Sequence, residues 1–206
     1  MGRYTGPKNR IARRFGTNIF GRTRNPLAHK ANPPGVHGAR RRKKSDFGLQ
    51  LEEKQKLKAC YGMLSEKQLL RYYRKAINKS GNTMANLIHE LEARLDIVVY
   101  RLKFANTIFQ AQQLVAHGHI EVDGKKVDIR SYQVRPGCFV SVREKSRKMK
   151  IVQEAKESGM RSVPEYFQID AEKFTGQMLS LPELEQVPLP IEVNIPVVCE
   201  FLAHNH

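Results

Sequence analysis

An Asp-Gly pair between alternating apolar residues constrains the fold of this 206-residue chain more than any other feature. The segment reads IEVDGKKVDI, with Asp123-Gly124 at its centre and four apolar positions around it, Ile120, Val122, Val127 and Ile129. A two-residue type I′ turn needs positive φ at both central residues, and Asp-Gly is among the pairs that provide it. The segment therefore predicts a tight β-hairpin.

Short helices are predicted on the N-terminal side of this hairpin, at about 95–103 and 107–117. Beyond the hairpin, Arg135-Pro136-Gly137 predicts a turn before a further strand, FVSVRE, and a helix is expected from about 146 to 158, ending at Gly159. The stretch 94–144 is rich in Lys, Arg, Gln and His and contains no recognisable catalytic group. Such a structured, basic surface suits a polyanion.

Charge is distributed unevenly along the chain. There are 36 Lys and Arg against 20 Asp and Glu, a net charge of +16. Residues 1–45 contain thirteen basic residues and no acid, whereas residues 151–206 contain three basic and nine acidic residues. Nucleic acid is the polyanion expected to bind the basic part, and the acidic end is expected to face protein or solvent.

The first 45 residues, here called the N-terminal arm, are punctuated by Gly and Pro and show no apolar periodicity. Alone in water such a segment is expected to be mostly disordered, because it buries too little apolar area to offset chain entropy. It could become ordered on RNA, with its cations against phosphates. The alternative is a solubilising tail.

Helical periodicity begins at Asp46. Three helices are predicted, the first over FGLQLEEKQKLKACYG, the second from Ser65, where Ser65 and Gln68 fit a capping box, and the third from near Thr83. Near the end of the chain, alternate apolar residues predict a strand, and three prolines would restrict it to an edge: Val187, Leu189, Ile191, Val193, Ile195 and Val197.

The sequence therefore predicts an α+β protein. We expect the N-terminal arm at 1–45, a small basic helical domain at 46–93 and a helix–hairpin RNA-binding domain on a short antiparallel sheet at 94–154. An acidic segment at 155–206 is expected to pack back on the body through edge strands. Three distant cysteines, with no CxxC, support neither a disulfide framework nor a zinc finger. Neither a signal peptide nor a membrane span is recognisable, so a cytoplasmic protein is expected.

Several blocks, in order, resemble the family of bacterial small-subunit ribosomal protein four over nearly the whole chain. They are RYTGPK, PGVHGARRRKKSDFGLQLEEKQKLKACYG, RYYRKA, LEARLDIVVYRL, QLVAHGHIEVDGKKV and VPEYFQID. The 94–144 stretch alone would be less specific, because a similar unit occurs in some tRNA synthetases, pseudouridine synthases and heat-shock proteins.

The resemblance implies a structural protein of the 30S subunit. Members of the family bind a multi-helix junction in the 5′ domain of 16S ribosomal RNA and nucleate assembly there. They lie beside ribosomal proteins three and five, where messenger RNA enters, and affect translational accuracy. No catalytic residue, cofactor or metal is expected; some relatives hold zinc through clustered N-terminal cysteines, which this arm lacks.

Candidate RNA-binding residues are cations for phosphates, polar side chains of the helix–hairpin domain, and Tyr4 for base stacking. In the arm they are Arg3, Tyr4, Lys8, Arg10, Arg13, Arg14, Arg40, Arg41, Arg42, Lys43 and Lys44. In the predicted helix from Ser65 they are Arg71 and Arg74. In the helix–hairpin domain they are Lys103, Thr107, Gln110, Gln113, His117, Lys125, Lys126 and Arg130. Many family members have Arg where this chain has Ile108 and Gln112.

Two other functions compete with this prediction. Arg94-Leu95-Asp96 superficially fits the catalytic RLD motif of pseudouridine synthases, but Ile97-Val98-Val99-Tyr100 follows it and no catalytic domain of sufficient length remains. Asp96 is therefore expected to be a cap or an ion-pair partner. The second alternative is a free, heat-shock-type RNA-binding factor, which a high-salt wash would strip from the ribosome.

Overall fold

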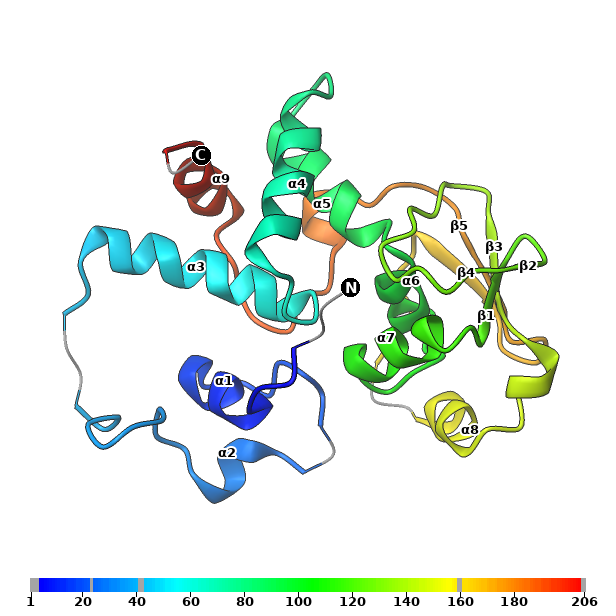
Figure 1. Cartoon of the computed structure of the whole chain (residues 1–206), viewed down its shortest axis with the longest axis horizontal. Coiled ribbons are helices and arrows are strands. Elements are labelled where there is room, and N and C mark those ends of the chain that lie inside the picture. Colours follow the sequence, from blue (N-terminus) through cyan, green and yellow to red (C-terminus); the bar gives the residue numbers. More distant parts are fainter. Residues whose placement is uncertain (1–3, 23, 41–42, 159–160, 205–206) are drawn as a thin grey trace. The chain divides into compact units, whose positions relative to one another are not determined.

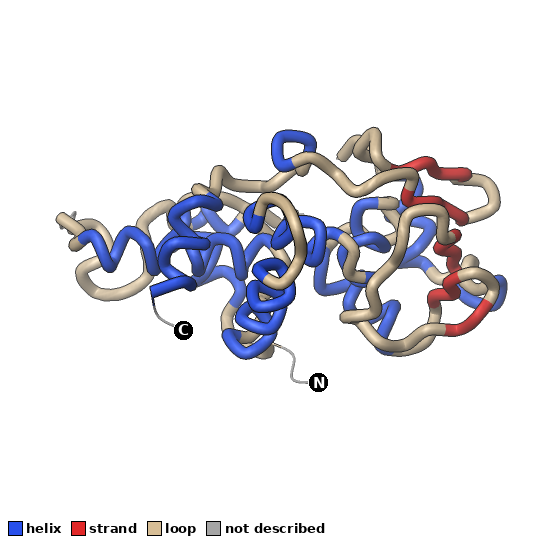
Figure 2. The backbone as a smooth tube through the Cα atoms, turned by 90° about the horizontal axis from the view of Figure 1, so that it is seen from above, coloured by secondary structure: helices blue, strands red, loops and turns tan. Residues whose placement is uncertain are grey.

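The computed structural model describes residues 4–22, 24–40, 43–158 and 161–204. The chain divides into two compact units: the first unit is Met1–Met84 with Leu189–His206, and the second unit is Ala85–Pro188. The described residues form nine α-helices and one five-stranded antiparallel sheet, so the predicted α+β class is confirmed (Figure 1). Every strand in this described part, red in Figure 2, belongs to the second unit.

The N-terminal arm contains more structure than its sequence suggests. Helix α1 (Lys8–Phe15) and helix α2 (Pro26–His29) contact each other. Ala12, Ile19 and Phe20 are buried. The prediction that this segment is mostly disordered when alone in water stays a prediction, whereas in the whole chain its described residues include two helices and three buried apolar side chains that no local periodicity reveals.

Helix α3 (Asp46–Cys60) and helix α4 (Glu66–Ile77) each begin directly after a serine that caps them, and the sequence predicted this role for Ser65 alone. The Ser45 side chain accepts a hydrogen bond from the Gly48 amide, and Ser65 accepts one from the Gln68 amide at 3.3 Å. A serine at this position satisfies an amide that the first helical turn leaves without a partner. Both predicted helices are therefore confirmed.

Helix α9 (Ile195–His204) overturns the predicted C-terminal strand. Asn194 caps it by accepting from the Val197 amide at 3.2 Å, and its backbone amide donates to Glu53 of α3 at 2.8 Å. The buried residues Val198, Phe201 and Leu202 follow helical spacing, and α9 contacts α3 and α4. The prediction was wrong because residues 187–194 belong to none of the described strands, and from Ile195 the chain is helical with Pro196 in the first turn, where a helix accepts proline.

In the second unit, helix α6 (Leu95–Arg101) and helix α7 (Ile108–Ala116) follow helix α5 (Thr83–Glu92), which begins at the boundary between the units. Strand β1 (Ile120–Val122) turns through Asp123 and Gly124 into strand β2 (Lys125–Lys126). The two turn residues have φ of 49° and 76°. The predicted hairpin and the two helices before it are therefore confirmed.

The sheet continues with strand β3 (Phe139–Val142), strand β4 (Phe167–Asp170) and strand β5 (Thr175–Met178). Its order is β2-β1-β3-β5-β4 with every pair antiparallel, so β4 is an edge strand. Strands β4 and β5 both come from the acidic segment at 155–206, but neither coincides with the strand predicted between Val187 and Val197.

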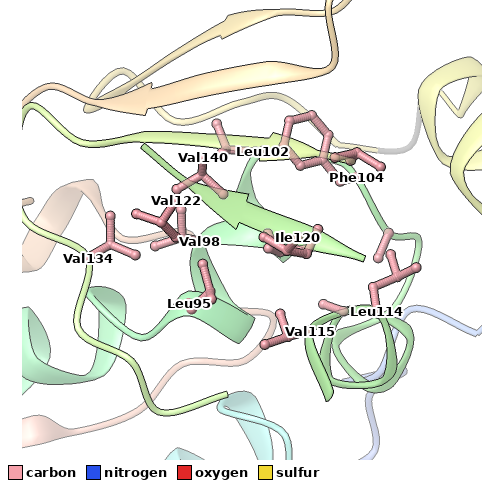
Figure 3. Packing of buried hydrophobic residues seen from close by; sticks show 14 of the residues in the cluster. Leu95, Val98, Leu102, Phe104, Leu114, Val115, Ile120, Val122, Val134 and Val140 are labelled. Carbon is pink, nitrogen blue, oxygen red and sulfur yellow. The ribbon is translucent and has the colours of Figure 1, made fainter. Parts of the chain in front are cut away.

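Apolar side chains of α6 and α7 pack against the inner face of this sheet, as Figure 3 shows for Leu95, Val98, Leu114, Ile120 and Val140. Leu102 comes close to the backbone of β5: a Cβ added to Gly176 would lie 2.4 Å from its Cδ2 atom. The absence of a side chain at Gly176 therefore sets how closely the helical layer approaches the sheet.

The remaining elements are the 3-10 helix η1 (Glu144–Ser146), helix α8 (Lys150–Glu157) and the 3-10 helix η2 (Leu184–Gln186). The helix expected from 146 therefore begins later, at Lys150, and Gly159 lies outside the described residues. The segment predicted as one acidic domain is divided between the units, because β4 and β5 complete the sheet whereas α9 packs on α3.

Candidate RNA-binding surface

The hairpin presents its cations at its exposed end. The Asp123 carboxylate accepts a hydrogen bond from the Phe139 amide at 2.8 Å, which fixes the turn to the neighbouring strand. Lys125 and Lys126 follow on β2 and are exposed. Two lysines on a turn fixed in this way are suited to phosphate contacts.

Two candidates on the neighbouring helix have an internal role. Thr107 Oγ1 accepts from the Gln110 amide at 3.2 Å, and Gln110 Oε1 accepts from the Thr107 amide at 3.0 Å. This capping box starts α7 and occupies both side chains. The signature T-x-x-Q was readable in the sequence, although we predicted these residues as RNA contacts. Gln113 and His117 are exposed, and Lys103 and Arg130 are half-buried.

Ile108 and Gln112, which replace arginines common in the resembling family, are both buried, with 4% and 9% exposure. Gln112 Nε2 donates to Asp96 Oδ2 at 3.3 Å, so this glutamine joins α7 to α6 inside the second unit. In this chain these two positions contribute to packing rather than to an exposed basic surface.

Asp96 is an ion-pair partner, as expected. Arg94 donates from Nε to Oδ1 at 3.0 Å and from Nη2 to Oδ2 at 2.7 Å. The Asp96 side chain has 0% exposure. A catalytic carboxylate must reach a substrate, and this one is enclosed with its arginine, so the resemblance to a pseudouridine synthase motif carries no catalytic function.

The first unit presents a separate set of cations. Arg10, Arg14, Arg40 and Lys43 are exposed in the arm. Arg13 is half-buried, because its guanidinium donates from Nε to the Asn32 carbonyl at 3.0 Å. Lys8 and Tyr4 are also half-buried.

The remaining first-unit candidates differ in how their charge is used. The Lys44 ammonium pairs with Glu52 of α3. Arg71 and Arg74 are exposed on α4, whose opposite face buries Leu69 and Tyr73. Arg3, Arg41 and Arg42 lie outside the described residues.

Residues 143–150, here called the basic turn, were not named among the candidates. The segment REKSRKMK contains five basic residues and one acid, a signal that was readable in the sequence. It follows β3 directly, spans η1 and ends at the first residue of α8. The sequence predicted Arg143 and Glu144 at the end of a strand and the residues from about 146 in a helix, and the segment was not considered as a charge cluster.

The three cysteines are half-buried free thiols. Burial raises the pKa of the Cys199 thiol to about 11, which keeps it protonated and unreactive near neutral pH.

Within the described ranges, no cluster of three or more His, Cys, Asp or Glu side chains could hold a metal ion. Over the same ranges, no helix combines the length and apolarity that crossing a membrane requires.

Comparison with known proteins gives two family matches and several full-length relatives. Residues 3–92 match the Ribosomal protein S4/S9 N-terminal domain, and residues 93–140 match the S4 domain. The small ribosomal subunit protein uS4 of Protochlamydia amoebophila (strain UWE25) is 69% identical over 205 residues, covering 100% of both chains. Proteins of the same name from Chlamydia trachomatis serovar L2 and Chlamydia muridarum are 58% identical over 208 residues, also covering 100% of both chains.

The S4 domain and the full-length relatives define the class of this chain as a structural RNA-binding protein rather than an enzyme. The match extends well beyond that domain, since full-length relatives align over the whole chain. The chain belongs to the uS4 family of small ribosomal subunit proteins.

Proposed function

We propose that this chain is a structural protein of the small ribosomal subunit that binds 16S ribosomal RNA directly. The observation that carries the proposal is the full-length identity of 69% to a small ribosomal subunit protein uS4. The structure adds a physical basis, since both units present exposed cations and the second unit contains the S4 domain.

Within that role, the 5′-domain junction of 16S RNA is the proposed binding site, and nucleation of 30S body assembly is the proposed consequence. Helical RNA hides its base edges in a deep groove, so a protein recognises its phosphates, 2′-hydroxyls and shape. The exposed arm residues Arg10, Arg14 and Arg40 and the hairpin residues Lys125 and Lys126 are suited to such recognition. Contact with about eight phosphates would weaken binding roughly a thousandfold or more between 50 and 200 mM salt.

Chemical footprinting of 16S RNA with the purified full-length chain tests the binding site. Protection confined to the 5′-domain junction is expected. Diffuse protection over the whole RNA would contradict a specific site and leave only generic affinity for RNA.

Further proposals concern the assembled subunit. We propose that the protein lies beside ribosomal proteins three and five, where messenger RNA enters, that it influences translational accuracy there, and that it resides in the cytoplasm. Crosslinking within isolated 30S subunits tests the neighbours, and a reporter that measures misreading tests the effect on accuracy.

Two experiments address the alternative functions. A structural constituent stays with 30S subunits at unit stoichiometry after a high-salt wash, whereas a free recycling factor is removed. No uridine isomerisation of ribosomal RNA is expected from the purified chain, because Asp96 is enclosed by its ion pair with Arg94.

A further inference from the structure

The turn at Gly118 and His119, between α7 and β1, collects cations from distant parts of the second unit. Lys126 lies across Gly118, because a Cβ added to this glycine would be 2.3 Å from the lysine Cε atom. Arg143 approaches the same residue, donating from Nη1 to the Gly118 carbonyl at 3.4 Å. Gly118 has φ of +70°, a conformation that favours glycine, so the backbone and the overlying lysine both require the small residue.

Hydrogen bonds hold the basic turn (143–150) against this glycine. The Arg143 amide donates to the His119 carbonyl at 2.9 Å, and the His119 Nδ1 atom lies 2.8 Å from the Ser146 hydroxyl. Arg147 Nε donates to the Val142 carbonyl at 3.1 Å, and Gln153 donates to the Arg147 carbonyl at 2.6 Å. The basic turn is therefore held at Arg143, Ser146 and Arg147.

These anchors use Nε and Nη1 of Arg143 and Nε of Arg147, and leave the Nη2 atom of Arg143 and both Nη atoms of Arg147 for a ligand. Arg143 Nε donates to Glu121 Oε1 at 3.2 Å, and the Nη atoms of Arg147 make no hydrogen bond to any described residue. Anchoring at Nε orients a guanidinium in advance, so less side-chain entropy is lost when its remaining donors bind. Paired guanidinium donors match the oxygens of a phosphate.

The surroundings favour an anion over a protein surface. Lys145, Lys148 and Lys150 are exposed along the basic turn, and Met149 is its single apolar side chain and is half-buried. The core of a protein interface is depleted in charge and enriched in aromatic side chains, which this turn lacks. Arg143 also binds a carbonyl near the C-terminus of α7, which offsets the negative end of the helix dipole.

We propose that Lys126, Arg143 and Arg147 form a phosphate-binding site for the backbone of folded RNA. The exposed lysines of the basic turn surround this site and strengthen its attraction for the same ligand. The inference rests on the proposed function, and it adds Arg143 and Arg147, which were not among the RNA-binding residues predicted from the sequence, to the proposed RNA-binding surface of the second unit.

The test uses the full-length chain and two transcripts of equal length, the 5′ domain of 16S RNA and an unrelated RNA. Fluorescence anisotropy gives Kd at several salt concentrations for wild type, Arg147→Gln and the matched control Arg135→Gln. Arg135 is exposed in the turn before β3, so its variant removes the same charge elsewhere in the second unit. We expect Arg147→Gln to weaken binding about tenfold. The salt slope, here the magnitude of the slope of log K for binding against the logarithm of the salt concentration, should fall by about 0.7–0.9 for each phosphate that the variant no longer neutralises.

Arg147→Lys and Lys126→Gln separate charge, geometry and folding. Arg147→Lys should restore the salt slope and only part of the affinity, because lysine lacks the paired donors. Lys126→Gln changes an exposed side chain and should lower the slope as Arg147→Gln does, so it keeps the test decisive if circular dichroism shows that Arg147→Gln does not fold.

The outcomes distinguish this inference from the function on which it rests. Slopes for Arg147→Gln and Lys126→Gln equal to that of Arg135→Gln, on both transcripts, overturn the phosphate site and leave the proposed function intact. Equal wild-type affinity for the two transcripts overturns specific recognition of the 5′ domain. In that case, a salt slope for Arg147→Gln and Lys126→Gln below that of Arg135→Gln, on either transcript, still supports the phosphate site.

Discussion

Single buried charges in this protein have structural partners, and Asp96 is the clearest example. Its carboxylate accepts two hydrogen bonds from Arg94 and one from Gln112, and it has 0% exposure. A charge removed from water in this way depends on its partner, so the pair is sensitive to the loss of either member.

Asp96→Asn should therefore destabilise the protein strongly. The variant leaves the Arg94 guanidinium buried without its carboxylate, a change that costs about 3–5 kcal/mol. Urea unfolding followed by circular dichroism measures the loss, with Asp128→Asn, an exposed position in the same unit, as the control. A variant as stable as this control would show that the ion pair does not contribute as the geometry indicates.

His119 should make stability depend on pH. Partial burial, together with the positive potential of His117 and Arg143, lowers its pKa below the usual 6.5. The unfolded chain therefore takes up a proton before the folded chain does, and the contribution to stability is complete above pH 6.5 and is lost as pH falls below it.

Urea midpoints at pH 7.5 and pH 5.5 measure this effect in wild type and in His119→Gln. Glutamine keeps a polar side chain near Ser146 but does not titrate, so the variant should lose less stability on acidification than wild type. The same loss in both proteins would assign the pH dependence to other groups.

At the scale of elements, local signals predicted the structure where they were strong. Asp123-Gly124 predicted the hairpin, and Ser65 predicted the start of α4, because turn and cap chemistry depend on neighbouring residues alone. The sequence of strand β5, TGQM, does not show the alternation of apolar and polar residues that predicts a strand. Its formation depends on pairing with β3 and β4, whose residues lie elsewhere in the sequence.

Gly176→Ala tests the packing of the helical layer on the sheet. The added methyl group would overlap Leu102, whose Cδ2 atom lies 2.4 Å from the ideal Cβ position, and overpacking of this kind costs about 1–3 kcal/mol. Thermal unfolding followed by circular dichroism measures it. Combining Gly176→Ala with Leu102→Ala should relieve the clash, and a double variant less stable than the sum of the two single changes would argue against direct contact.

At the scale of the whole molecule, charge predicted the class of ligand, whereas the use of each charged side chain depends on tertiary contacts. The acid-free arm indicated RNA, yet Arg13 is partly used in holding the Asn32 backbone and Lys44 pairs with Glu52. Thr107 and Gln110 cap a helix, whereas the basic turn was overlooked. Sequence shows which side chains carry charge, but tertiary hydrogen bonds decide which donors remain available.

Replacing Arg40, Arg41 and Arg42 together by Ala should lower the salt slope of binding to 16S RNA by about 2–3, if each contacts one phosphate. Anisotropy across a salt series measures the slope. The corresponding triple change to Lys keeps the charge and should preserve it. An unchanged slope in the Ala variant would remove these residues from the interface.

Helix α9 packs on α3 and α4 across more than a hundred intervening residues. During synthesis, the polypeptide must therefore be translated to its last helix before the first unit can close. The second unit, Ala85–Pro188, has its own apolar core and can assemble earlier. We expect the second unit to fold before the first unit, although the first unit begins earlier in the sequence. Until α9 is synthesised, the apolar surfaces of α3 and α4 that it covers stay exposed and can bind chaperones.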